Sequence, residues 1–180
     1  MRHIPNILSA LRVAMVGLFI YLFVSNRMLA VLIVFVAAFL TDLLDGYLAR
    51  RNGWITDVGK VLDPLADKLM LLTALVCFYT RNWIPAWLLI IVLAKELLMI
   101  VGGVLLYRKN VVVYADWFGK SAAGFFNAGV AVTLLKLYIP QIGFWNLVLF
   151  LIAMILAIVA LVHYARLQIF SRMKQDDPKD

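Results

Sequence analysis

Six long apolar stretches, separated by short polar breaks, make up almost the whole chain. Each stretch is long enough to cross a bilayer as an α-helix, which takes about 20 residues at a rise of about 1.5 Å per residue. The tryptophans fall near the ends of these stretches, where amphipathic rings settle at a membrane surface. The pattern predicts six transmembrane helices, over Ile7–Val24, Met28–Ala49, Val61–Thr80, Ile84–Tyr107, Trp117–Leu137 and Phe144–Leu167.

Composition agrees with this pattern. The 180 residues are 65% hydrophobic and 15% charged, with a mean hydropathy of +0.96, whereas a soluble domain is about 45–50% apolar and about 25% charged. We therefore expect an all-α integral membrane protein. Residues 1–170 are predicted to form one six-helix domain, and residues 171–180 a short polar cytoplasmic tail.

The basic residues predict the orientation in the membrane. They gather at both termini and in the second and fourth connections, as with Arg50, Arg51, Arg108 and Lys109, whereas the other connections carry few. By the positive-inside rule, both termini and the even connections are cytoplasmic. The net charge of +7 then reflects this orientation and attraction to anionic headgroups. Nucleic acid is not an expected partner.

Four carboxylates interrupt the apolar pattern around the second connection: Asp42, Asp45, Asp63 and Asp67. One Asp at the centre of a membrane helix costs about 2.5–3.5 kcal/mol on insertion scales, so these groups must face water, a metal or each other. Spacings of three and four residues place the two members of each pair on one helix face, provided that both segments are helical. Two adjacent helices could then direct all four carboxylates into one pocket that opens toward the cytoplasm.

Such a pocket suits hard divalent cations. Mg²⁺ and Mn²⁺ prefer carboxylate oxygens together with substrate phosphates, and two such ions can clamp both oxygens of a phosphoryl transfer. Gly46 and Gly59 remove side chains where a ligand could approach, and Arg50 offers a planar fork for a phosphate oxygen. The alternative is that the glycines only allow close helix packing, the acids are solvated at the membrane edge, and Arg50 is an orientation charge.

The segment that carries these residues resembles the signature of the CDP-alcohol phosphotransferases, D-x2-D-G-x2-A-R-x8-G-x3-D-x3-D. All eight defined positions match at every spacing. The opening Pro5-Asn6-Ile7-Leu8-Ser9 with Arg12 is similar to that of the phosphatidylglycerophosphate synthase and cardiolipin synthase branches. The matching signature positions are Asp42, Asp45, Gly46, Ala49, Arg50, Gly59, Asp63 and Asp67.

The resemblance implies a six-helix enzyme that uses CDP-diacylglycerol as donor and releases CMP. It implies that the four aspartates bind two Mg²⁺ or Mn²⁺ ions and that Asp67 also takes the proton from the acceptor hydroxyl. It further implies a homodimer and, by likeness to bacterial branches, a bacterial inner membrane with the active site facing the cytoplasm. The residues implied to hold the cytidine diphosphate moiety are Asn6, Arg12, Asp45, Gly46, Ala49, Arg50 and Gly59.

The acceptor is predicted less directly. The glycerol-phosphate branch usually carries Arg-Glu where this chain has Lys95-Glu96, and a second lysine where this chain has Ala122. Glycerol 3-phosphate is the favoured acceptor, and phosphatidylglycerol, which would make the enzyme a cardiolipin synthase, is the alternative. Lys95 and Glu96 could instead form ion pairs inside the bundle. The candidate acceptor-binding cations are Lys60, Lys95, Arg108 and Lys120.

A different class of protein, an ion transporter with an acid-lined pathway, is also compatible with ionisable groups inside a membrane. Transporters of this kind tend to have repeated halves and sites near the midplane. Here the acids crowd two consecutive stretches, and the chain shows no second copy of the motif. The sequence therefore favours the enzyme.

Overall fold

The computed structural model describes the backbone of residues 4–52, 57–107 and 117–173, and the side chains of residues 11–42, 67–101 and 117–163. Within these ranges the chain forms six α-helices, one short 3-10 helix and no strand, as the sequence predicts. In chain order the elements are α1 (Ile4–Val24), α2 (Met28–Asn52), α3 (Asp57–Thr80), α4 (Ala86–Tyr107), α5 (Trp117–Leu135), η1 (Pro140–Ile142) and α6 (Trp145–Met173).

Four helices, α1, α2, α3 and α6, extend further than the hydropathy pattern predicts, and α1 begins at Ile4. The polar stretch 51–59 was expected to be a break, but α2 continues to Asn52 and α3 already begins at Asp57. Similarly, α6 continues to Met173, inside the segment predicted as a tail. Hydropathy marks where apolar side chains end, whereas the helical backbone satisfies its own hydrogen bonds and continues through polar residues.

The turns after α1 and α3 are built alike. Asn26 and Asn82 have φ values of 58° and 57°, the left-handed conformation that asparagine tolerates better than most residues. In each turn the next amide donates back to a carbonyl five residues earlier, Arg27 N to Leu22 O at 3.0 Å and Trp83 N to Phe78 O at 2.9 Å. This geometry satisfies the last carbonyls of both helices and reverses the chain.

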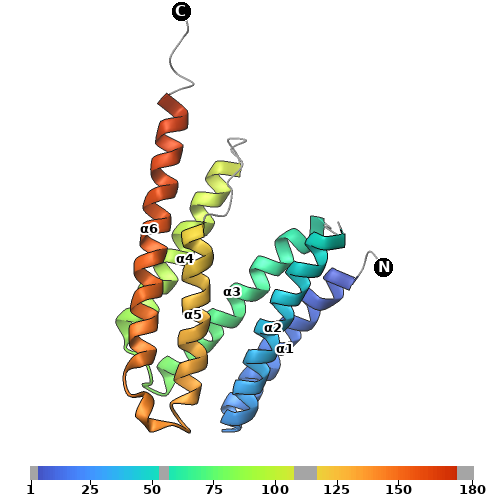
Figure 1. Ribbon diagram of the computed structural model, residues 1–180, viewed down its shortest axis with the longest axis vertical. Helices are drawn as coiled ribbons and strands as arrows, with labels where there is room; N and C mark the ends of the chain where they lie inside the picture. The colour runs from blue at the N-terminus through green and yellow to red at the C-terminus, as the bar shows by residue number, and fades with distance from the viewer. Residues whose placement is uncertain (1–3, 53–56, 108–116, 174–180) are drawn as a thin grey trace, which may run out of the picture.

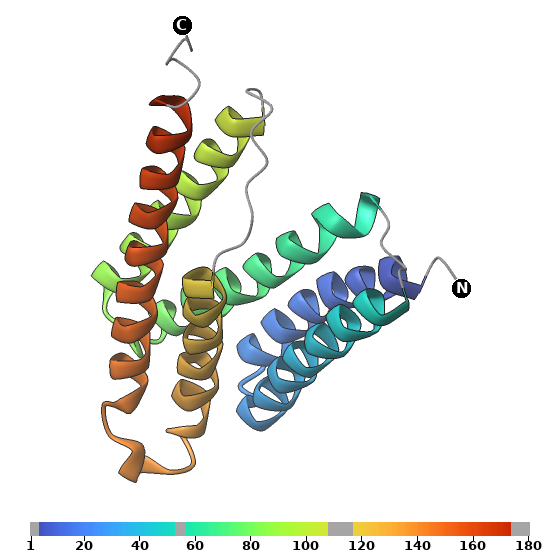
Figure 2. The same ribbon diagram turned by 45° about the horizontal axis from the view of Figure 1, so that its top comes forward.

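Successive helices run in opposite directions (Figure 1). The turns that join α1 to α2, α3 to α4 and α5 to α6 lie at one end of the molecule, and the first residue of α1 and the last residues of α2, α4 and α6 lie toward the other. The main contacts of α1 are with α2 and α3, and α5 packs most extensively on α6. In both views α1, α2 and α3 lean away from α5 and α6 (Figure 2).

Aromatic rings close the bundle near the first two turns. Phe23 packs against Phe78 and Trp83, with ring centroids 6.4 and 5.6 Å apart. The Arg81 guanidinium lies 5.5 Å from the centre of the Phe23 ring and donates a hydrogen bond of 2.5 Å to Asn26 Oδ1. These contacts tie the α1–α2 turn to the α3–α4 turn at the end of the bundle away from the start of α1.

Large apolar side chains are exposed along several helices, among them Ile33, Leu97 and Ile155, each at least 59% exposed. Exposed apolar surface of this extent is typical of contact with lipid or with another protein. Within the described residues, Trp145–His163 is the one helical segment long and apolar enough to cross a membrane, while 11–24 and 28–42 are shorter apolar stretches.

Candidate active site

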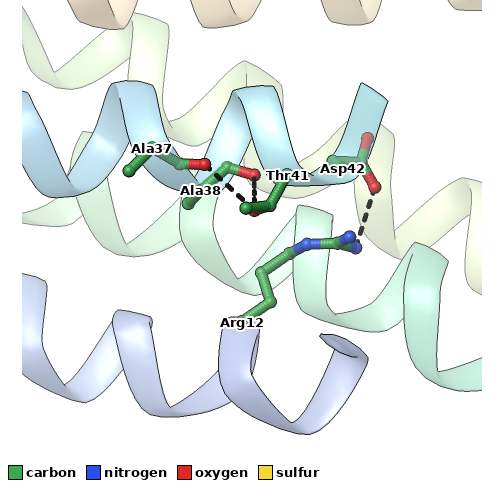
Figure 3. A network of polar contacts seen from close by, with 5 residues as sticks. All are labelled: Arg12, Ala37, Ala38, Thr41 and Asp42. Atoms are coloured by element: carbon green, nitrogen blue, oxygen red, sulfur yellow. Dashed lines mark hydrogen bonds and ion pairs between the residues drawn. The ribbon is translucent and has the colours of Figure 1, made fainter. Parts of the chain in front are cut away.

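A buried ion pair joins the first two helices. The Arg12 side chain on α1 is only 2% exposed, and its Nη1 lies 2.8 Å from Asp42 Oδ1 on α2. Figure 3 shows the guanidinium of Arg12 directed across to the carboxylate of Asp42. The neighbouring Thr41 hydroxyl instead lies against its own helix, 3.0 Å from Ala37 O and 2.9 Å from Ala38 O. A buried guanidinium requires such a partner, because an isolated charge in an apolar interior is strongly unfavourable.

Asp67 on α3 lies beside this pair. Four charged side chains are within electrostatic range of its carboxylate, and they come from four helices: Arg12, Asp42, Lys68 and Glu96. Asp67 and Asp42 therefore belong to one site, although 25 residues separate them in the sequence. The structure thus brings together one carboxylate from each of the two predicted pairs.

Glu96 on α4 extends the site toward α5. Its carboxylate is 7% exposed and forms ion pairs with Lys68 of α3, at 2.9 Å, and with its neighbour Lys95. The ammonium group of Lys95 also lies 5.5 Å from the centre of the Phe126 ring on α5. Lys95 and Glu96 therefore form ion pairs inside the bundle, as the alternative reading of the sequence allows.

These contacts form one charged layer to which four helices contribute, with the Phe126 ring of α5 beside it. We define this layer by three cations and three carboxylates, whose formal charges cancel. Charges inside an apolar bundle are stable when they are paired in this way, and ionisable groups in a membrane helix usually have a function. The members of the charged layer are Arg12, Asp42, Asp67, Lys68, Lys95 and Glu96.

Most other predicted site residues have side chains outside the described residues, although their backbones are helical. Asp45 lies on α2 with Asp42, and Asp63 lies on α3 with Asp67. The condition for a shared face is therefore met in both pairs, because both segments are helical. The same holds for the backbone of Asn6 on α1, of Gly46, Ala49 and Arg50 on α2, and of Gly59 and Lys60 on α3.

The remaining acceptor candidates differ in position. Lys120 is exposed on the first turns of α5, and Arg108 lies outside the described residues. Ala122, where related sequences were expected to carry a lysine, is 4% exposed on α5. It precedes Phe126 by one helical turn and so shares the face over which Lys95 lies.

Two of the four predicted metal ligands have side chains within the described residues. The described side chains include no group of three or more His, Cys, Asp or Glu residues that could hold a metal ion. Of the four predicted ligands, the described ranges include Asp42 and Asp67. Both are hard oxygen donors on adjacent helices within one site, so the donor chemistry available there suits Mg²⁺ or Mn²⁺.

Sequence reasoning did not assign Lys68 or Glu96 to the site. One signal was available, because Glu96 is the single glutamate of the chain and lies in a helix that is otherwise almost entirely apolar. An unmatched ionisable residue in such a helix is a reason to expect a partner on a neighbouring helix.

Comparison with known proteins agrees with the motif. Residues 2–164 match the family model described as CDP-alcohol phosphatidyltransferase. The match covers almost the entire chain and extends well beyond the signature around the acidic residues.

Among similar proteins, the cardiolipin synthase (CMP-forming) of Streptomyces coelicolor is 37% identical over 141 residues, which are 74% of this chain and 65% of that protein. The CDP-diacylglycerol--glycerol-3-phosphate 3-phosphatidyltransferase of Aquifex aeolicus is 28% identical over 90% of this chain and 93% of its own length. The Bacillus subtilis protein of the same name is 32% identical over 67% of this chain and 70% of its own length.

Proposed function

Because this chain belongs to the CDP-alcohol phosphatidyltransferase family, we propose that it transfers a phosphatidyl group from CDP-diacylglycerol to an acceptor hydroxyl in phospholipid biosynthesis. The favoured acceptor is glycerol 3-phosphate, and the leaving product is CMP. The observation that carries the proposal is the charged layer, which brings Asp42 and Asp67 of the family signature together with Arg12. A transferase also explains the clustered carboxylates better than an acid-lined transporter does.

The proposed cofactors are two Mg²⁺ or Mn²⁺ ions, held by Asp42, Asp45, Asp63 and Asp67. When bound, such ions supply electrostatic stabilisation of the negative charge that develops on the transferred phosphoryl group. The two described members of this set fit the role because they are oxygen donors on α2 and α3 whose charges act on each other. Arg12 compensates part of their mutual repulsion.

In the proposed reaction, the acceptor oxygen attacks the phosphorus that is bonded to the diacylglycerol. Asp67 takes the proton of the acceptor hydroxyl, and the bond from that phosphorus to the bridging oxygen of CMP breaks. The electron pair leaves with CMP, while the new ester bond joins the phosphatidyl group to the acceptor. General-base assistance of this kind contributes typically about 10²–10⁴-fold to the rate.

Donor binding is proposed for the residues around the first half of the signature. The Arg12 guanidinium is a suitable phosphate partner because it is held rigidly by Asp42 and presents several N–H donors. The glycines would let the nucleotide approach the helix backbone. The proposed set is Asn6, Arg12, Asp45, Gly46, Ala49, Arg50 and Gly59.

For the acceptor we propose the cations Lys60, Lys95, Arg108 and Lys120. Glycerol 3-phosphate is favoured because the similar proteins of Aquifex aeolicus and Bacillus subtilis are named for it. Phosphatidylglycerol is the second candidate, because the Streptomyces coelicolor protein is named a cardiolipin synthase. In this chain Ala122 stands where a second cation was expected, which lowers the charge available for a phosphomonoester.

We also propose that all six helices cross a bacterial inner membrane, with both termini and the site on the cytoplasmic side. The helices contain between 19 and 29 residues, so each is about 28 Å or longer and matches a hydrocarbon core of about 30 Å. Their alternating directions (Figure 1) fit six successive crossings. The exposed apolar side chains of α4 would face lipid or a second copy in the proposed homodimer.

CMP release by the purified protein tests the proposal and separates the acceptors. CDP-diacylglycerol and Mn²⁺ or Mg²⁺ are supplied with glycerol 3-phosphate in one reaction and phosphatidylglycerol in the other. We expect release that depends on the metal and on glycerol 3-phosphate. Release with phosphatidylglycerol alone would instead assign the cardiolipin synthase reaction, and no release with either acceptor would refute the transferase.

A further inference from the structure

We propose that Glu96 is a positioning residue that holds the ammonium groups of Lys68 and Lys95 as a cationic wall beside Asp67, and that an anionic phosphate of the acceptor binds to this wall. The inference rests on the proposed transferase function and deepens it. Neither Glu96 nor Lys68 is among the acceptor-binding cations proposed above.

The first observation is the burial gradient within this group. The side chain of Glu96 is 7% exposed, whereas the side chains of Lys95 and Lys68 are 17% and 33% exposed. Glu96 is therefore the most buried of the three side chains, and both lysine side chains keep some exposed surface. A substrate would meet the cations first, with Glu96 behind them.

The second observation is that both cations are held from different sides of the bundle. Lys68 reaches Glu96 from α3, while Lys95 is fixed between Glu96 and the ring of Phe126 on α5. Each ammonium has three N–H donors, and its ion pair with Glu96 occupies only part of this capacity. Asp67 also attracts Lys68 electrostatically. Donors therefore remain on both groups for a further anion.

The third observation is the charge balance next to Asp67. Two ammonium groups share one carboxylate, so the group as a whole has one net positive charge. The charges of both Lys68 and Glu96 act on the carboxylate of Asp67, so the wall adjoins the group proposed as the base. An acceptor with a hydroxyl at Asp67 and a phosphate a few atoms away could satisfy both ends at once.

Removal of the carboxylate has a definite expected consequence. In a Glu96→Gln variant the side chain keeps its shape, but the two ammonium groups lose their shared counter-ion and repel each other at short range in a medium of low dielectric constant. At least one of them moves away from its position. The acceptor then loses a charge-assisted hydrogen bond, whereas the donor site around Arg12 and Asp42 keeps its contacts.

The test compares the two substrates in the full-length protein in detergent or vesicles. For Glu96→Gln we expect the KM for glycerol 3-phosphate to rise about tenfold or more, with the KM for CDP-diacylglycerol retained. Glu96→Asp keeps the charge and should recover part of the lost acceptor affinity. Thr133→Val is the matched control, because it removes a buried polar group between α5 and α6 and leaves the charged layer intact.

A double-mutant cycle shows whether Glu96 acts through Lys95. If it does, Glu96→Gln adds little to the acceptor KM in a Lys95→Gln background, because coupled residues are not additive. Full additivity, or an equal rise in the KM values of both substrates, would overturn the positioning role. If Glu96→Gln does not fold, Lys68→Gln and Lys95→Gln each remove one ammonium group of the wall, and an unchanged ratio of the two KM values in both variants would overturn the wall.

Failure of the proposed role of Glu96 can be distinguished from failure of the proposed transferase function. A wild-type protein that releases no CMP with any acceptor contradicts the transferase itself. A wild-type protein that is active with glycerol 3-phosphate, together with a Glu96→Gln variant of unchanged acceptor KM, contradicts only the role of Glu96.

Discussion

At the scale of single residues, Asp67 has the most specific proposed role. Replacement by asparagine keeps the shape of the side chain but removes its ability to take a proton. We expect Asp67→Asn to lower the rate of CMP release by about 10² or more, while CDP-diacylglycerol still binds. Single-turnover CMP release measures the rate, and equilibrium binding measures the affinity for the donor. Asp57→Asn on the same helix is the control variant. An Asp67→Asn protein of normal rate would remove Asp67 as the base.

The positive charges of Arg12 and of the proposed metal ions should each offset the repulsion between the carboxylates, so that one can partly replace the other. Asp42 and Asp67 repel each other, and Arg12 is the buried cation that pairs with Asp42. In Arg12→Gln we expect a loss of about 3 kcal/mol, near the lower limit for breaking a buried pair because Asp42 is partly exposed. Mn²⁺ or Mg²⁺ should recover part of this loss, which thermal unfolding with and without EDTA measures.

The exposed Arg27 gives the control for that experiment, since Arg27→Gln removes the same charge from the α1–α2 turn. We expect its melting temperature to respond to the metal as that of the wild-type protein does, because its metal site is intact. Equal losses for Arg12→Gln in EDTA and in Mn²⁺ would mean that a divalent cation does not compensate for Arg12 beside these carboxylates.

The residue scale also shows what a single sequence can predict about the site. Asp42 and Asp67 could be proposed from the sequence because the motif is local and its helical spacing has a direct geometric meaning. Lys68 and Glu96 could not, because their ion pair depends on how α3 packs against α4. Hydrophobic periodicity identifies both helices but does not determine which residues meet across them.

At the scale of elements, the α5–α6 pair depends on one glycine. A Cβ atom at Gly129 would lie 2.7 Å from Phe150 Cε1, and the Phe150 ring is fully buried. We expect Gly129→Ala to destabilise the protein by about 1–3 kcal/mol through overpacking. Gly124→Ala is the matched control on the same helix, because nothing lies within 4 Å of its added Cβ.

Thermal unfolding of both variants in detergent decides this prediction. Gly124→Ala should be neutral or stabilising by up to about 1 kcal/mol, since alanine is the better helix former. Equal melting temperatures for the two variants would show that α5 and α6 do not approach as closely as the contact of Gly129 with Phe150 requires.

At this scale, some features of the helices could be predicted from the sequence and others could not. The cores of all six helices follow from apolar length, and the turn at Asn26 follows from its polar residues. The polar end of α2 and the continuation of α6 to Met173 were missed. Those ends are helical because the backbone hydrogen bonds continue through polar residues, and a hydropathy pattern does not detect such bonds.

At the scale of the whole molecule, the arrangement predicts which ends share a side of the membrane. The α1–α2, α3–α4 and α5–α6 turns lie at one end (Figure 1), and the hydrogen bond of Arg81 to Asn26 joins two of them.

In a Cys77→Ser background, Ser25→Cys and Tyr138→Cys should react with a membrane-impermeant thiol reagent from outside intact cells. Gln175→Cys should react only after the membrane is opened, and the reverse pattern would contradict the proposed orientation.

The charged layer gathers groups from α1, α2, α3 and α4 against a ring of α5, so the proposed chemistry belongs to the whole bundle. The number of helices and the acidic motif could be predicted from the chain, but this convergence could not, because it depends on three-dimensional packing. The central claim is that the assembled layer directs the acceptor oxygen onto the phosphorus that carries the lipid.

Isotope transfer tests that claim most directly. The purified protein is given CDP-diacylglycerol, the divalent metal and glycerol 3-phosphate labelled with ¹⁸O in its primary hydroxyl, and both products are analysed by mass spectrometry. Our account predicts that the label enters the new phospholipid and that CMP is unlabelled. Label in the phosphate of the released nucleotide, or the absence of any labelled lipid, would contradict it.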